Sequence, residues 1–178
     1  MILVLNDVVM KLIIYRIFSF LLLPIAILFT MTVLLFLRAA FANPAMLFPI
    51  FLIACIVIYS FTSLNFLIKG IDGKRTLAKS SKDWIKVNAM VSIVFALLMI
   101  TQCIVLLMHP EMLQDVANQS MQNAGAEFKM SKVNIGNYLR ITSYFFLVYA
   151  IVLFVHTLMS FQYLKMYSYL FQQEKIEY

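Results

Sequence analysis

The sequence predicts an all-α membrane protein in which four transmembrane helices cross a lipid bilayer. Hydrophobic residues make up 63% of the 178 residues, charged residues make up only 12%, and the apolar residues fall in long uninterrupted blocks. A water-soluble domain could not keep that much apolar surface away from solvent. We therefore expect one membrane domain that comprises residues 1–178.

Four apolar blocks have the length of a membrane span. Each contains roughly 20 residues, the number that crosses ~30 Å of hydrocarbon as an α-helix. None has Asp, Glu, Lys or Arg in its interior. Only a helix satisfies its own backbone hydrogen bonds within one such segment. The expected spans are residues 17–37, 45–68, 87–108 and 142–161.

The distribution of Lys and Arg predicts how the spans are oriented. Ten of these residues lie in the N-terminal segment, the loop 69–86 and the C-terminal tail, and four lie in the first and third loops. Basic residues are enriched on the cytoplasmic side of membrane proteins. We therefore expect an up-down-up-down arrangement in which the N and C termini and the loop 69–86 are cytoplasmic.

The loop 69–86 contains several recognisable signals. Gly70 and Gly73 predict the end of the second helix, and Ser80 and Asp83 predict a capping box that opens the third. Trp84, the only tryptophan, is expected to be an anchor at the membrane interface. The basic side chains of this loop are expected to contact anionic lipid; they are Lys69, Lys74, Arg75, Lys79, Lys82 and Lys86.

Two further segments lie outside the predicted spans. The extracytoplasmic loop 109–141 should contain a short amphipathic helix that begins near Pro110 and ends near Gly125. The tail 162–178 lacks Gly and Pro and should continue the fourth helix into the cytoplasm. An aromatic and apolar side of that tail either packs against the basic loop, the favoured alternative, or docks a partner; it comprises Tyr163, Tyr167, Leu170 and Phe171.

Small and polar residues predict which helix faces meet. On the third and fourth spans they recur at intervals of four or seven residues, which predicts a left-handed bundle with crossings near +20°. Side chains of this kind let helices approach closely and hydrogen-bond in lipid. The predicted packing residues are Asn88, Ser92 and Ala96 on the third span, Ser143, Tyr149, Ala150, His156 and Thr157 on the fourth, and Ser60 and Ser63 on the second.

Gln102 and His156 are the most costly polar side chains to place in lipid, and an intramembrane ionisable residue is a functional-site hypothesis. A proton relay would need a chain of titratable groups, but no span contains Asp, Glu or Lys beside His156. We expect a neutral His156 that is hydrogen-bonded between helices, at the level of Ser60 and Ser63.

The sequence contains no motif for catalysis, metal binding, a cofactor or nucleic acid, and Cys55 and Cys103 lie inside spans as small packing residues. We therefore expect no enzyme activity and no cofactor. The predicted function is that of a structural, accessory or assembly subunit of a larger membrane complex, or of a homo-oligomer, in a bacterial inner membrane. The alternative is a small transporter or oligomeric channel that uses His156 and Gln102 as polar intramembrane groups.

Overall fold

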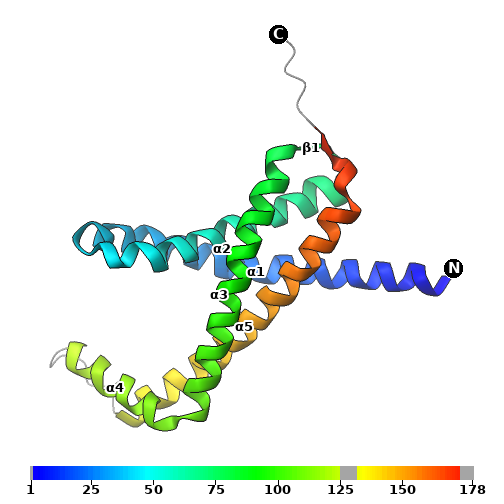
Figure 1. Ribbon diagram of the computed structural model, residues 1–178. Helices are drawn as coiled ribbons and strands as arrows, with labels where there is room; N and C mark the ends of the chain where they lie inside the picture. The colour runs from blue at the N-terminus through cyan, green and yellow to red at the C-terminus, as the bar shows by residue number, and fades with distance from the viewer. Residues whose placement is uncertain (1, 125–131, 173–178) are drawn as a thin grey trace. The chain divides into compact units, whose positions relative to one another are not determined.

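The structure is a computed structural model that describes residues 2–124 and 132–172 (Figure 1). Five α-helices follow one another in this part of the chain, with short π and 3-10 segments and two very short strands between and after them. The helices are α1 (Ile2–Ala42), α2 (Leu47–Asn65), α3 (Lys79–Met108), α4 (Pro110–Ala124) and α5 (Lys132–Met166). The strands are β1 (Leu77–Ala78) and β2 (Phe171–Gln172).

Four helical stretches are long and apolar enough to cross a membrane, as predicted. They are Met10–Ala42, Pro44–Asp72, Lys79–Met108 and Ile135–Met166, and each contains one predicted span. Each is also longer than its apolar block, because a helix continues to satisfy its own backbone after the hydrophobic residues end. The chain is thus an integral membrane protein by the length and composition of its helices.

The connection between α1 and α2 is a tight turn. Asn43 accepts a hydrogen bond from the backbone N–H of Ala45 on its side chain, at 3.2 Å, and Pro44 occupies the first position of a 3-10 helix, Pro44–Met46. Proline suits that position because its missing N–H would have no helical partner there. The turn brings α2 back beside α1 (Figure 1).

The second span ends in a π-helix, Phe66–Asp72, rather than directly at a glycine. Gly73 is its C-cap and donates its N–H to the carbonyl of Ile68, while Lys74 has a positive φ of 50°. Gly70 lies within the π-helix, where a Cβ would come within 3.0 Å of the Leu77 side chain. Of the two glycines expected to end this helix, only Gly73 therefore does so.

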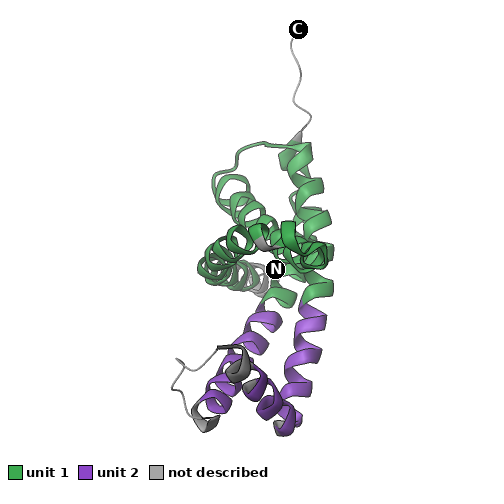
Figure 2. Ribbon diagram, turned by 90° about the vertical axis from the view of Figure 1, so that its left-hand side faces the viewer, with its two compact units in different colours: residues 1–95, 153–178 green, residues 96–152 purple. Residues whose placement is uncertain are grey.

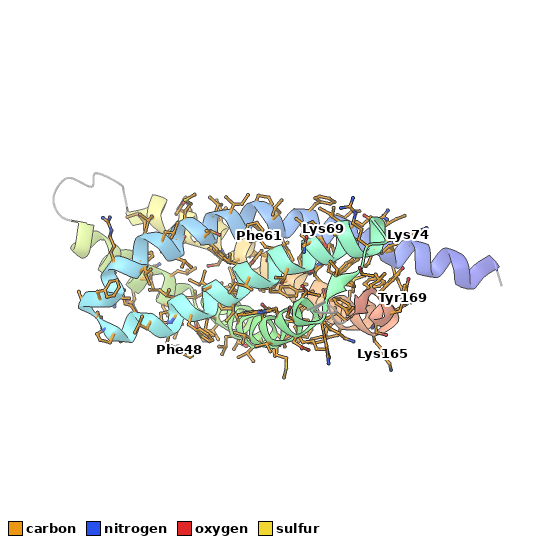
Figure 3. All side chains as sticks on the ribbon, turned by 90° about the horizontal axis from the view of Figure 1, so that it is seen from above. Phe48, Phe61, Lys69, Lys74, Lys165 and Tyr169 are labelled. Carbon is orange, nitrogen blue, oxygen red and sulfur yellow. The ribbon has the colours of Figure 1, made fainter. Side chains whose placement is uncertain are left out.

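The chain segments beyond α2 and α5 meet in a small clasp. Strands β1 and β2 pair in parallel, so that Leu77 lies opposite Phe171. The Phe171 ring packs on Phe66 with 5.3 Å between centroids, and the Lys82 ammonium lies 5.6 Å from the Phe171 ring. Figure 3 shows the ends of these two helices near each other, with Lys69, Lys74, Lys165 and Tyr169 labelled.

The tail therefore lies against the basic loop, but not as a continuous helix. Helix α5 ends at Met166, and a 3-10 turn, Ser168–Leu170, leads into β2. This break allows Leu170 to be buried and Phe171 to reach Phe66, which a straight helix would not place there. No glycine or proline signals the break, so the sequence pattern predicted a helix up to residue 178. The part of the tail after residue 172 lies outside the described residues.

The chain forms two compact units (Figure 2). Unit 1 comprises residues 1–95 and 153–178, and unit 2 comprises residues 96–152. In unit 2, α4 begins at Pro110 and ends at Ala124, as the sequence predicted, and Leu113 is buried. The His109 ring lies 2.9 Å from the Glu111 carboxylate. The pKa of Glu111 is lowered mainly by a backbone hydrogen bond to its carboxylate, and secondly by this contact with His109.

The space around Gly73 provides a test of the turn after α2. A Cβ at residue 73 would lie 2.8 Å from the backbone oxygen of Lys69, so Gly73→Ala must displace the main chain. We expect it to lower the free energy of unfolding by about 1–3 kcal/mol, the usual cost of overpacking. The measurement is thermal unfolding in detergent, followed by circular dichroism.

Gly136→Ala on α5 is the matched control, because nothing lies within 4 Å of the position that the added methyl group would take. Alanine is a better helix former than glycine, so this change should stabilise the protein by up to about 1 kcal/mol. Equal melting temperatures for the two variants would contradict the predicted clash at residue 73.

Candidate functional site: a buried polar cluster

The structure buries almost all of the packing residues that the sequence singled out. In unit 1 the buried ones are Ser60, Ser63, Asn88, Ser92, His156 and Thr157. In unit 2 they are Ala96, Ser143, Tyr149 and Ala150. Gln102, also in unit 2, is exposed. It therefore does not face the interior of its unit.

Most of the buried hydroxyls among these predicted packing residues do not join helices. Those of Ser60, Ser92 and Thr157 each donate to the carbonyl four residues earlier in their own helix. Ser143 does the same, and the Asn88 amide donates to the carbonyl of Trp84. These residues satisfy their own polar groups and are small, so they allow neighbouring helices to approach closely.

Three helices of unit 1 carry a polar ring followed four residues later by a serine. The pairs are Tyr15 and Ser19 on α1, Tyr59 and Ser63 on α2, and His156 and Ser160 on α5. Residues at i and i+4 share one face of a helix. All six side chains are buried and form one cluster of hydrogen bonds, which we call the polar cluster.

His156 is held on three sides within the polar cluster. Its Nε2 lies 2.8 Å from the Ser19 hydroxyl, and its Nδ1 lies 2.8 Å from the Tyr59 hydroxyl. The Tyr15 ring stacks on the imidazole with 4.6 Å between centroids and 4° between planes. The histidine of α5 is therefore tied to both α1 and α2.

Ser160 forms the second junction of the polar cluster. Its oxygen lies 2.8 Å from the Tyr59 hydroxyl and 3.1 Å from the Tyr15 hydroxyl. The Tyr15 hydroxyl is also 2.9 Å from that of Ser63. The two tyrosines thus each contact a serine of α5, and Tyr15 reaches α2 as well.

The proton positions around His156 follow from Ser19. The Ser19 hydroxyl donates its single proton to the backbone carbonyl of Tyr15 at 2.9 Å. Its oxygen must then accept from His156, which places the ring proton on Nε2. In a neutral imidazole Nδ1 is then the acceptor and receives the proton of the Tyr59 hydroxyl. Both ring nitrogens are hydrogen-bonded in this arrangement.

The donor and acceptor roles of the remaining hydroxyls follow from this assignment. Because Tyr59 donates to His156, its oxygen accepts from Ser160. The Ser160 oxygen then accepts from Tyr15, whose own oxygen accepts from Ser63. Every hydroxyl and ring nitrogen in the polar cluster takes part in a hydrogen bond, so no side-chain proton is left to donate to a ligand.

An ion pair also joins α1 to the end of the second span. Arg16, the residue after Tyr15, pairs with Asp72 at the end of the π-helix. Both side chains are more than one-third exposed, so the pair contributes little to stability. It nevertheless joins the same two parts of the chain, α1 and the end of the second span, that the polar cluster joins.

The tail residues considered for partner docking are largely covered by the chain itself. Tyr163 is buried against Tyr15, with 4.7 Å between ring centroids, and Leu170 is also buried. Tyr167 is half-buried, and Phe171 packs on Phe66 as described above. Tyr169, which the sequence did not single out, is exposed.

The residues that were expected at the membrane interface, Trp84 and the basic side chains of the loop 69–86, lie mostly at the protein surface. Trp84 is 58% exposed. Lys82 is half-buried over Phe171, while the other basic residues of the loop are exposed: Lys69, Lys74, Arg75, Lys79 and Lys86. Among the described residues, no group of three or more His, Cys, Asp and Glu side chains could hold a metal ion.

Removing one hydroxyl tests the polar cluster. Tyr59→Phe should lower the free energy of unfolding by about 1–2 kcal/mol, because it leaves the buried Nδ1 of His156 without a donor. Tyr144→Phe, which removes an exposed hydroxyl on α5, should change it by less than about 0.5 kcal/mol. Both free energies of unfolding can be measured by titrating the protein with a denaturing detergent. An equal loss of stability in the two variants would contradict the role of the polar cluster.

Comparison of the chain with protein-family models, with curated proteins and with solved structures returned no match. No family therefore suggests a substrate, a partner or a reaction for the polar cluster. The function is inferred from the fold and from the chemistry of the residues alone.

Proposed function

We propose that this chain is a non-enzymatic, multi-pass membrane protein that acts as a structural, accessory or assembly subunit of a larger membrane complex. The observation that carries the proposal is the polar cluster, whose side-chain protons are all donated in hydrogen bonds, most of them between helices. Such a cluster fixes the relative positions of α1, α2 and α5 and offers no reactive group. It is suited to a scaffold.

The outward faces of the helices support an interaction role. Large apolar side chains are exposed along each span, including Leu28 on α1, Phe48 on α2, Val94 on α3 and Val148 on α5. Lipid can cover such surfaces, and so can the apolar helices of another membrane protein or of a second copy. The chain also contains twelve methionines, whose flexible side chains adapt to varied surfaces.

The transporter or channel alternative receives less support. A proton-handling histidine needs a nitrogen that can exchange with a pathway, and both nitrogens of His156 are hydrogen-bonded to neutral hydroxyls. Gln102, the other polar group of that hypothesis, is exposed and is not part of the polar cluster. We therefore favour the accessory role.

For the topology we propose an up-down-up-down, left-handed bundle with both termini cytoplasmic, in a bacterial cytoplasmic membrane. The asymmetric placement of Lys and Arg supports the orientation. Seven-residue spacings among buried positions support the handedness, because such repeats favour left-handed packing. On α5 these positions are Ser143, Ala150, Thr157 and Leu164.

The orientation has a direct test. Single cysteines at Thr76, in the basic loop, and Gln119, on α4, should react with an impermeant thiol reagent from opposite sides of the membrane. The two native cysteines are buried and serve as the background, or are replaced by alanine. Labelling of both new cysteines from the same side would contradict the proposed topology.

The accessory role predicts a defined complex. Extracted in mild detergent, the full chain should co-purify with one membrane protein, or with itself, at a fixed ratio across several detergents. Tryptophan substitutions at Leu28, Phe48, Val94 and Val148 then locate the contact: the one at the partner interface should release the partner, and those facing lipid should not. A lone monomer in every detergent would contradict the proposal.

A further inference from the structure

Gln102 is a polar side chain that lies inside a membrane span without a partner. Helix α3 is long and apolar enough to cross a membrane, and residues 87–108 of it contain no charged side chain. At ~1.5 Å per residue, Gln102 is about 10 Å along the helix from His109, the first residue after α3. Its side chain is exposed, and in the described part of the chain it makes no hydrogen bond or ion pair. The carboxamide is therefore uncovered at a depth where the surroundings are hydrocarbon.

The polar neighbours of Gln102 on α3 do not have this problem. The Thr101 hydroxyl donates to the carbonyl of Leu97 at 2.9 Å, and the Cys103 thiol is buried and only weakly polar. A carboxamide, in contrast, carries two N–H donors and a carbonyl acceptor, and an apolar medium that bonds none of them is unfavourable. Gln102 therefore favours an arrangement that supplies both a donor and an acceptor at its own depth.

The surface around Gln102 is apolar and uncharged. Leu98, four residues before it, is 57% exposed, and Val105, three residues after it, is half-buried. Residues at these spacings share one face of a helix, so Leu98, Gln102 and Val105 form a stripe, which we call the Gln102 stripe. Alternating steps of four and three residues are also the spacing of a seam between two helices. The stripe thus has the form of a helix-packing surface with one polar group in it.

We propose that the Gln102 stripe binds the same stripe of a second copy of this chain, so that the two Gln102 side chains exchange hydrogen bonds. Each carboxamide donates one N–H to the carbonyl oxygen of the other, around a two-fold axis along the membrane normal. Leu98 and Val105 pack on either side of this pair. A single polar residue in an otherwise apolar seam is known to fix the register and the number of helices that associate.

Depth and hydrogen-bonding chemistry both favour a second copy as the occupant. Copies of one chain that insert in the same orientation bring Gln102 to the same depth, so each carboxamide meets a group that it can reach. A carboxamide is also self-complementary, because it is donor and acceptor at once. A partner helix with an Asp, Glu, Lys or Arg would bring a charge to a surface that has no counter-charge, and a wholly apolar helix or a lipid tail would leave the carboxamide unsatisfied.

Crosslinking in vesicles tests the geometry. In a background in which Cys55 and Cys103 are replaced by alanine, Leu98→Cys places one thiol on the Gln102 stripe. Ile104→Cys is the matched control, because Ile104 is also exposed but lies roughly 200° around α3 from Gln102. The purified full chain is reconstituted in phosphatidylcholine vesicles at a low protein-to-lipid ratio and treated with a membrane-permeable bifunctional maleimide. Leu98→Cys should yield dimers several-fold more efficiently than Ile104→Cys.

Substitution of Gln102 tests the role of the carboxamide. Dimerisation is measured in the same vesicles by energy transfer between copies that carry a donor or an acceptor dye on a Thr76→Cys thiol, in the background without native cysteines. Gln102→Leu should weaken dimerisation about tenfold or more, the scale of two interhelical hydrogen bonds in lipid. Gln102→Asn, which keeps the carboxamide, should retain most of the dimer.

Gln119→Leu is the matched control for this substitution. Gln119 is also exposed, but it lies on α4, outside the four candidate spans, so its replacement should leave the dimer unchanged. Because both glutamines are exposed, neither change should unfold the chain, and circular dichroism verifies that each variant keeps its helix content.

A monomer at every protein-to-lipid ratio would overturn the inference. So would a dimer of unchanged affinity in Gln102→Leu, or equal crosslinking from Leu98→Cys and Ile104→Cys, because either result would place the contact elsewhere. Association only after another membrane protein is added would also overturn it, since the carboxamide would then belong to an interface between different proteins.

The inference shares the membrane placement of α3 with the proposed accessory role, but the two have separate tests. The dimer is measured with the purified chain, whereas the accessory role is measured by co-purification from the membrane. A complex that contains one copy of the chain would support the accessory role and overturn the dimer. A pure dimer would uphold this inference without supporting an assembly with other proteins.

Discussion

Hydrocarbon offers no hydrogen-bond partner to a polar side chain, and the arrangement of unit 1 depends on this constraint. A buried imidazole or hydroxyl without a partner costs free energy that lipid does not return. His156, Tyr15 and Tyr59 therefore have to find each other's helices or neighbouring serines. Because each hydroxyl has one proton, the hydrogen bonds also acquire a direction, which ends on the Tyr15 carbonyl.

The same constraint explains why the polar cluster uses only neutral groups. A charge at this depth would need a buried counter-charge, and the desolvation cost of such a pair can exceed its attraction. The ion pair of Arg16 with Asp72 instead lies where both side chains are more than one-third exposed. The clasp between β1 and β2 joins the segments that follow α2 and α5, so these two of the three helices of the cluster are connected a second time beyond their ends.

The sequence predicted the spans well because membrane helices are defined by local hydropathy, and it predicted the short helix from Pro110 for similar reasons. It also identified His156 as a residue that needs an interhelical partner. It missed Tyr15, which lies before the apolar block and next to Arg16. The signal was nevertheless present, as a polar ring followed four residues later by serine on three different helices.

Other features could not be read from local patterns, because they depend on contacts between distant segments. The helical pattern continues past Met166, yet the chain leaves the helix so that Phe171 reaches Phe66. Likewise, α3 begins at Lys79, directly after the paired strand β1, so Ser80 and Asp83 lie inside the helix and do not form the expected capping box. In both cases the tertiary contact outweighs the local preference.

The polar groups at the start of α3 differ from those in the interior of the spans. Inside, the hydroxyls and ring nitrogens of the polar cluster are all paired, since lipid tails would leave them unsatisfied. Asp83 and Ser80 make no hydrogen bond or ion pair with another described residue, and both are exposed at the start of a span, where water or lipid headgroups can bind them. Trp84 is exposed at the same end of α3, and tryptophan is favoured at such a boundary because its ring is apolar while its indole N–H is polar.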